Sequence, residues 1–173
     1  MGRTRCHEAA KVKRWEATVS ALGLTAAAAG GYFVWRHRYD GIGDGYVDGQ
    51  RVRLRLVTVD GKPVEPATAA AFELMRAAAR ASGVSLRIVS AFRTFAEQEY
   101  FHNCYRTGTC NQGHFAARPG YSSHQSGRAL DLNARTSGVY EWLRKYAGDF
   151  AFFETVEDEP WHWEYQPEKE VAT

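Results

Sequence analysis

The hydrophobic and polar residues of this chain follow two regular patterns after residue 50. From Val52 to Val59 apolar residues alternate with arginines, and a period of two is typical of a strand with one buried face. The DGKP sequence that follows favours a turn. Apolar residues then recur at helical spacing from Pro66 to a stop at Gly83. The pattern therefore predicts a strand, a turn and an amphipathic helix in succession.

The same two patterns predict the elements of the remaining chain. Two further helices are expected over residues 94–106 and 137–147, and the Gly-rich and polar stretch 107–125 is typical of a loop. Apolar strands are expected within residues 85–92, 127–134, 149–156 and 161–166. Together these elements predict an α+β fold, in which a small, mostly antiparallel sheet has helices packed on one side.

Composition divides the chain into segments. Residues 40–50, DGIGDGYVDGQ, combine Gly with Asp, a composition that is typical of a linker. The alternation of Asp and Gly could also suggest a calcium loop, but the residue spacing of an EF-hand is absent. Before it, residues 1–39 form a basic segment with a hydrophobic helix. After it, residues 51–168 form the folded domain and residues 169–173 a tail.

The N-terminal segment has the features of a membrane anchor or an export signal. Residues 1–16 carry five Lys or Arg, whereas residues 17–35 carry no charge. At about 1.5 Å per residue, this uncharged stretch is close to the roughly 30 Å thickness of the hydrocarbon core. The positive-inside tendency places the rest of the chain outside the cytoplasm. We expect an uncleaved transmembrane anchor; a signal peptide cleaved near Ala26–Ala29 and a soluble Ala-rich helix are the alternatives.

Charge and cysteine usage exclude several function classes. The formal net charge is +2, and the basic residues beyond the N-terminal cluster are dispersed, so nucleic acid is not an expected partner. The cysteines Cys6, Cys104 and Cys110 form no C-x-x-C pair, which excludes a cysteine zinc finger and a thioredoxin-type motif. Cys104 and Cys110 could form a disulfide in an oxidising compartment, or remain unpaired thiols.

A histidine and an aspartate stand seven residues apart in the stretch PGYSSHQSGRALDLN. In the strand expected here, Asp131 shares a face with Ala129 and Asn133, while two leucines occupy the other face. An ionised carboxylate in the middle of an apolar strand is costly unless it is paired or bound to a metal. Asp131 therefore requires an arginine partner or a metal ion. If it binds a metal ion, His124 is a candidate for a second ligand.

A second polar cluster lies near the C-terminus, where His162 stands between two tryptophans and three residues after Glu159. Zinc prefers imidazole nitrogen and carboxylate oxygen, and a catalytic site uses three protein ligands with an open fourth position. The set of His124, Asp131 and His162 meets that requirement. Glu159 is best placed to accept the proton of an activated water, and Glu157 and Asp158 are its alternates. Scattered polar residues without a metal remain the alternative on spacing alone.

The third stretch lies at the predicted strand-to-helix junction between Ser90 and Gln98. An arginine there, Arg93, can bind a substrate carboxylate in a bidentate fork or stabilise a developing oxyanion. A surface salt bridge is the simpler alternative.

Together the three stretches resemble the M15 family of zinc peptidases, the VanY-like D-alanyl-D-alanine carboxypeptidases. The family pattern reads S-x-x-R-x-x-x-x-Q, then G-x-S-x-H-x-x-G-x-A-x-D, then E-x-W-H, and the joint occurrence of all blocks in order is far more specific than one block alone. The matching residues are Ser90, Arg93 and Gln98 in the first block, Gly120, Ser122, His124, Gly127, Ala129 and Asp131 in the second, and Glu159, Trp161 and His162 in the third.

The resemblance covers roughly residues 52–166 and implies a role for each matching position. It implies that Glu159 is the general base and that Arg93 contacts the scissile carbonyl or the peptide carboxylate. It further implies that Zn²⁺ lies in a cleft across the exposed face of the sheet. The implied zinc ligands are His124, Asp131 and His162, and the implied substrate-binding residues are Ser90, Arg93, Gln98 and Ser122.

The segment from His102 to Arg118 departs from the family pattern and lies where the substrate loop is expected. His102 and His114 match no ligand position, and we interpret them as loop residues.

The implied activity is zinc-dependent hydrolysis of the terminal D-Ala-D-Ala bond of peptidoglycan stem peptides, outside the cytoplasm. The alternatives are an endolysin-like endopeptidase and a non-catalytic zinc-containing module that binds the cell wall. The presence of Glu159 argues against the binding module, because a binding site needs no base. A soluble intracellular dipeptidase would require that residues 17–35 are not an export segment.

Overall fold

The computed structural model describes residues 41–169. The basic and hydrophobic segment expected over residues 1–39, with its uncharged stretch 17–35, lies outside the described residues, as does nearly all of the predicted tail. Among the helices of residues 41–169, none has the length and apolar character that a membrane span requires.

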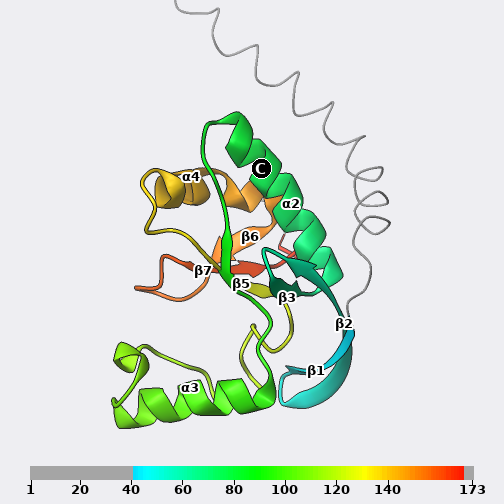
Figure 1. The fold of residues 1–173 in the computed structure, drawn as a ribbon, viewed down its shortest axis with the longest axis vertical. Coiled ribbons are helices and arrows are strands. Elements are labelled where there is room, and N and C mark those ends of the chain that lie inside the picture. Colours follow the sequence, from blue (N-terminus) through cyan, green and yellow to red (C-terminus); the bar gives the residue numbers. More distant parts are fainter. Residues whose placement is uncertain (1–40, 170–173) are drawn as a thin grey trace, which may run out of the picture. The chain divides into compact units, whose positions relative to one another are not determined.

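Two antiparallel sheets and three α-helices make up the domain (Figure 1). One sheet has the strand order β1-β2-β3 and the other the order β4-β5-β7-β6. The elements in chain order are β1 (Gly41–Val47), β2 (Gln50–Val59), β3 (Lys62–Val64), α2 (Pro66–Ala81), β4 (Ile88–Ser90), α3 (Phe95–Thr107), the 3₁₀ turn η1 (Asn111–Gly113), β5 (Ala129–Leu132), α4 (Val139–Tyr146), the 3₁₀ turn η2 (Ala147–Phe150), β6 (Phe152–Glu154) and β7 (His162–Tyr165). The α+β class is confirmed, and so are the locations of the helices and strands predicted after residue 50.

The predicted linker over residues 40–50 is wrong for residues 41–47, which form β1 and pair with β2 along their whole length. Asp44 accepts hydrogen bonds from Arg51 and Arg53 across the strand pair. A side chain at Gly45 would lie 2.7 Å from the carbonyl oxygen of Gln125, so glycine permits a close approach there. The Gly and Asp residues that resemble a linker in sequence thus serve cross-strand pairing and close packing.

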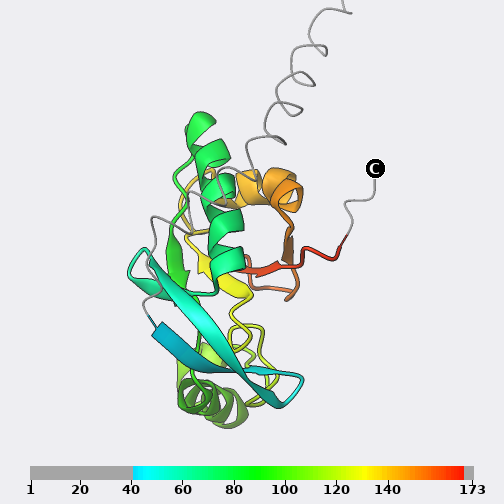
Figure 2. The same cartoon turned by 90° about the vertical axis from the view of Figure 1, so that its right-hand side faces the viewer.

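The arrangement of helices on one side of a single sheet is also wrong. Figures 1 and 2 show α2 and α4 on one side of the four-stranded sheet and α3 on the other side, beside β1. The buried residues of α3 are Gln98 and Cys104, so this helix lacks the apolar stripe that packs a helix onto a sheet. It contacts the β1–β2 hairpin instead, where the rings of Tyr46 and Phe95 lie 4.9 Å apart.

The main core lies between α2 and the four-stranded sheet. Its largest fully buried apolar side chains are Phe72 and Met75 of α2, Leu130 and Leu132 of β5, Leu143 of α4 and Phe152 of β6. Burying one such side chain contributes about 1.5–3 kcal/mol. Leu130 and Leu132 face this core, so the alternation of β5 turns Asp131 to the opposite face of the sheet.

The N-terminal cap of α3 determines where the connection between β4 and α3 ends. Thr94 and Glu97 form a capping box, in which the Glu97 carboxylate accepts from the Thr94 backbone N–H at 2.8 Å. The helix α3 therefore begins at Phe95, and its N-cap Thr94 directly follows Arg93. This residue is held between the end of β4 and the first turn of α3, as the strand-to-helix prediction requires.

Candidate metal centre and active site

Adjacent strands bring two of the predicted ligands together. Asp131 of β5 pairs with His162 of β7 on one side and with Ser90 of β4 on the other. The Oδ1 atom of Asp131 lies 3.3 Å from Nδ1 of His162. Residues that are 31 positions apart in sequence are thus neighbours because β5 and β7 are antiparallel partners.

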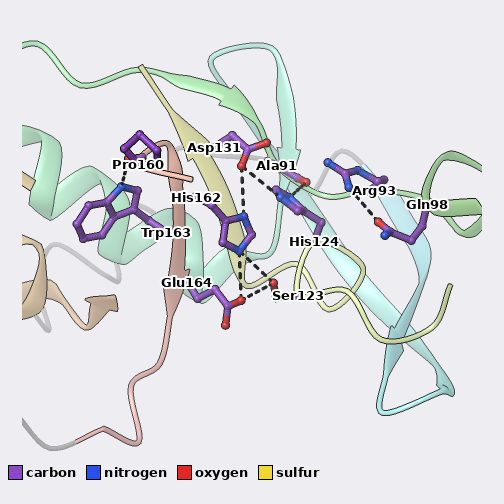
Figure 3. A network of polar contacts seen from close by, with 10 residues as sticks. All are labelled: Ala91, Arg93, Gln98, Ser123, His124, Asp131, Pro160, His162, Trp163 and Glu164. Carbon is purple, nitrogen blue, oxygen red and sulfur yellow. Dashed lines mark hydrogen bonds and ion pairs between the residues drawn. The ribbon is translucent and has the colours of Figure 1, made fainter. Parts of the chain in front are cut away.

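The third predicted ligand, His124, lies in the turn before β5 and is 4% exposed. Its Nδ1–H donates to the carbonyl oxygen of Ala91 at 2.7 Å, which leaves Nε2 directed toward Asp131 at 3.4 Å (Figure 3). Gly127 closes this turn with φ +75°, and a side chain there would meet Cβ of Glu65 at 2.7 Å. The glycine match in the sequence pattern therefore has a steric reason.

The three groups fit a metal ion. One ligand atom from each of His124, Asp131 and His162 lies within 4.8 Å of the others. The hydrogen-bond partners of Asp131 are these two histidines, so within residues 41–169 the arginine partner considered from sequence is not found. Two imidazole nitrogens and one carboxylate oxygen are the ligand types that zinc prefers.

Sequence reasoning missed one residue of this site, Glu164. Its Oε1 lies 3.2 Å from Nε2 of His162 and accepts a hydrogen bond from the Ser123 hydroxyl at 2.7 Å (Figure 3). Gln166 donates to the second oxygen, Oε2, at 3.1 Å. Glu164 follows His162 by two residues and therefore shares its strand face. That spacing was the signal that could have identified it.

In the metal-free site, hydrogen bonds between the histidines and the carboxylates stabilise the charged form of Asp131, His162 and Glu164. Burial raises the pKa of Asp131, but hydrogen bonds from His124 and His162 outweigh it and hold the pKa well below its usual value. Burial lowers the pKa of His162, but its hydrogen bonds to Asp131 and Glu164 outweigh burial and raise the pKa to about 9. Burial likewise raises the pKa of Glu164, and its hydrogen bonds to His162 and Ser123 bring it to about 2.

Glu159 is half-buried in the cleft wall, next to the metal ligands. Its carbonyl oxygen accepts from the backbone N–H of His162 at 2.8 Å, so a tight turn joins the two residues. Burial raises the pKa of Glu159, the charge of His162 lowers it, and the charge of Asp131 raises it. Glu157 and Asp158 are exposed and lie outside the cleft lining, so the geometry favours Glu159 as the base among these three.

Arg93 is held by neighbours on α3 and in the turn that carries His124. Its guanidinium donates to Oε1 of Gln98 at 2.9 Å and lies over the Phe101 ring at 4.3 Å. Its backbone N–H donates to the carbonyl of His124 at 3.1 Å. Gln98 in turn donates to the carbonyl of Ala117 at 2.7 Å. Gln98 therefore holds Arg93 and the loop together, in addition to lining the cleft.

A cleft of about 1380 Å³ contains the site. All the predicted catalytic, metal and substrate-binding residues line it, including Ser90 and Ser122. The segment between α3 and the His124 turn forms part of its wall. A disulfide between Cys104 and Cys110 closes the base of this segment, and the ring of His114 packs edge-on against Trp161 at 5.2 Å. The disulfide alternative is confirmed. His102 and His114 are outside the ligand cluster, as predicted, but the interpretation of His102 as a loop residue is wrong, because it lies in α3.

Known proteins share this arrangement in sequence and in fold. A family model described as VanY, D-alanyl-D-alanine carboxypeptidase, matches residues 61–168. A D-alanyl-D-alanine carboxypeptidase of Enterococcus faecalis (strain ATCC 700802 / V583) is 33% identical over 114 residues, which cover 51% of this chain and 42% of that protein. The chain thus spans less than half the length of this curated relative.

Two solved structures are similar at 26% identity and cover 65% of this chain. One is VanYB in complex with D-Alanine-D-Alanine, with a TM-score of 0.56 and 77% of that chain covered. The other is a mutant of the vancomycin resistance D,D-pentapeptidase VanY from a VanB-type resistance cassette, in complex with Zn(II). Its TM-score is 0.54, and 78% of that chain is covered.

Proposed function

Because the chain belongs to the VanY family of D-alanyl-D-alanine carboxypeptidases, we propose that it hydrolyses the bond between the two terminal D-alanines of peptidoglycan stem peptides and uses zinc to do so. The observation that carries this proposal is the convergence of His124, Asp131 and His162 in one cleft with Glu159 beside them. The solved relatives support it, since one holds D-Alanine-D-Alanine and the other Zn(II).

The zinc would be held by Nε2 of His124, a carboxylate oxygen of Asp131 and Nδ1 of His162. When bound, it supplies Lewis-acid activation of a carbonyl group and of water. Glu159 removes a proton from the attacking water and returns it to the amine that leaves. Burial raises the pKa of Glu159, which makes its carboxylate a stronger base toward the attacking water than an exposed glutamate.

Arg93 is placed to hold the peptide. Its guanidinium keeps donors beyond the one used by Gln98, and these can bind the terminal carboxylate or the scissile carbonyl. Because Gln98 and Phe101 fix the guanidinium in advance, little side-chain entropy is lost when the peptide binds.

Mass analysis of products from purified muropeptides tests the proposal. The zinc-loaded protein should release a single terminal alanine. Cuts at internal bonds would show that the endopeptidase alternative is correct, and an absence of cleavage with retained binding would favour the cell-wall binding module.

We also propose that residues 17–35 anchor the protein in the membrane and leave the domain outside the cytoplasm. Two observations support this location: the Lys and Arg residues precede the uncharged stretch, and the domain carries the Cys104–Cys110 disulfide, which is typical of oxidising compartments. A reporter that is active only outside the cytoplasm, fused after Thr173, should be active. A stable but inactive fusion would exclude this topology.

A further inference from the structure

Two exposed arginines that line the cleft, Arg87 and Arg135, have no role in the mechanism above. We propose that Arg87 and Arg135 form a second carboxylate-binding subsite, which binds an acidic group of the peptide two or three residues before the scissile bond. This inference rests on the proposed function and adds a specificity for acidic peptides to it.

The register of β4 and β5 places Arg87 on the far side of the metal centre from Arg93. The backbone N–H of Asn133 donates to the carbonyl of Arg87 at 3.1 Å, and the Arg87 N–H donates to Oδ1 of Asn133 at 2.8 Å. Asp131 pairs with Ser90 further along the same two strands, and Arg93 follows Ser90. Arg87 and Arg93 therefore lie at opposite ends of β4, with the metal ligands between them.

The alternation of β4 turns Arg87 into the cleft. Ile88 is buried in the core face, so its neighbours Arg87 and Val89 face the other way, and both line the cleft. Adjacent residues on a strand rise about 3.3 Å. The row of Arg87 and Asn133 is therefore about 7 Å from the row of Asp131, which is the length of two residues of an extended peptide.

Arg135 lies two residues beyond Asn133, in a turn that is held by hydrogen bonds. The Asn133 side-chain amide donates to the carbonyl of Ser85 at 3.0 Å and to the hydroxyl of Thr136 at 3.3 Å. The Arg135 guanidinium lies over the ring of Trp161 at 5.4 Å. Trp161 precedes the ligand His162, so Arg135 is joined to the wall of the metal site by an aromatic contact.

In the part of the chain that the structure describes, no carboxylate is paired with these two cations. Within residues 41–169, neither guanidinium forms a salt bridge or a hydrogen bond with a carboxylate, whereas other exposed arginines of the domain, such as Arg51 and Arg128, do.

Two unneutralised guanidinium groups beside the same cleft attract an anion, and their planar donor forks match a carboxylate. With the terminal carboxylate or scissile carbonyl at Arg93, an extended peptide crosses the metal ligands and continues toward Trp161 and Arg87. The group that reaches the two arginines belongs to the part of the peptide on the amino side of the scissile bond. Its chemistry is that of a free carboxylate.

Peptides that end in D-Ala-D-Ala and differ in one upstream group test the inference. One peptide carries a free carboxylate two or three residues before the scissile bond, and the matched peptide carries the corresponding amide. The zinc-loaded full chain should cut the acid peptide with a kcat/KM about tenfold or more above that for the amide, mainly through KM, as expected for hydrogen bonds between charged groups. In the double variant Arg87→Gln, Arg135→Gln, the two peptides should be cut at similar rates.

The control is the double variant Arg80→Gln, Arg144→Gln, which removes the same charge from α2 and α4 outside the cleft and should keep the full acid preference. Cleavage of the amide peptide by each variant shows that it is folded. Equal rates for both peptides in the wild type, or a preserved preference in Arg87→Gln, Arg135→Gln, would overturn the subsite and leave the proposed function intact. Failure of the wild type to cut either peptide would overturn both.

Discussion

Glu164 and Asp131 contact opposite nitrogens of the His162 ring, Glu164 at 3.2 Å from Nε2 and Asp131 at 3.3 Å from Nδ1. Because Asp131 is itself a candidate ligand, the metal position lies on the Nδ1 side. Nε2–H then donates to Glu164, which fixes the tautomer and the orientation of the ring. The Ser123 hydroxyl and Gln166 hold Glu164 in place in the same way.

Replacement of Glu164 by glutamine should weaken zinc binding. The variant keeps the shape of the side chain but loses the charge that orients His162, and loss of such an outer partner typically costs about 10–100-fold in metal affinity. Competition with a chromophoric chelator measures the affinity. The matched control is Glu168→Gln, an exposed carboxylate that pairs with Arg128. Equal affinities for wild type and Glu164→Gln would show that Glu164 does not position the ligand.

The wild-type domain should bind one zinc per chain, and His162→Ala should show a marked drop in bound metal. Removal of one of three ligands leaves too few protein donors for a stable site. Elemental analysis of the purified protein measures the stoichiometry. His102→Ala and His114→Ala serve as controls, because both histidines lie outside the ligand cluster. Full occupancy in all three single variants of His124, Asp131 and His162 would refute the site.

Glu159→Gln should lose hydrolysis by a factor of about 10²–10⁴ while it keeps its zinc. The amide preserves the shape of the side chain but cannot accept the proton of the attacking water. Turnover of a D-Ala-D-Ala peptide and metal content are measured on the same sample. Asp158→Asn is the control, since that neighbouring carboxylate is exposed and outside the cleft lining. Near-normal turnover in Glu159→Gln would transfer the role of base to Glu157 or Asp158.

The stability of the metal-free protein should fall both as the pH rises above about 6.5 and as it falls below about 4. Its hydrogen bonds raise the pKa of His162 to about 9, above the usual value of about 6.5. That contribution is complete below about pH 6.5 and is lost as the pH rises toward 9. The pKa values of Asp131 and Glu164 are lowered, so their contribution is present above about pH 4 and is lost in acid.

Calorimetry of the metal-free protein should therefore show the highest Tm between about pH 4.5 and 6.5. In the variant His162→Gln, which has no titrating imidazole at this position, the fall between pH 6.5 and 9 should be much smaller. A wild-type Tm that does not change over this alkaline range would contradict the role of the Asp131 and Glu164 contacts.

Loss of the disulfide should destabilise the domain by about 2 kcal/mol, from the entropy of a loop this short. In a Cys6→Ser background, alkylation should modify neither remaining cysteine before reduction and both Cys104 and Cys110 afterwards. Denaturant unfolding with and without reductant measures the difference in free energy. Modification of both thiols without reductant would show that the bond is not formed in the isolated protein.

Local patterns in the sequence were enough to predict the helices after residue 50 and the strands β2, β4, β5, β6 and β7. The full set of candidate metal ligands came from the order of three short motifs and the family resemblance that they carry. The alternation around Asp131 required a partner for a carboxylate in an apolar strand, and the spacing of Glu159 and His162 indicated which residues would join it. These features depend on neighbours within about ten positions, and the periods of strands and helices are local properties of the chain.

Features that depend on contacts between distant segments were decided only by the tertiary structure. Composition alone suggested a linker at residues 41–47, because the partners that make it a strand lie on β2 and in the His124 turn. The Ser123–Glu164 contact joins positions 41 apart, and the placement of Arg87 across the metal centre from Arg93 follows from the register of β4 on β5. Which strands pair, and in what register, is set by the burial of the whole core, so no local pattern contains this information.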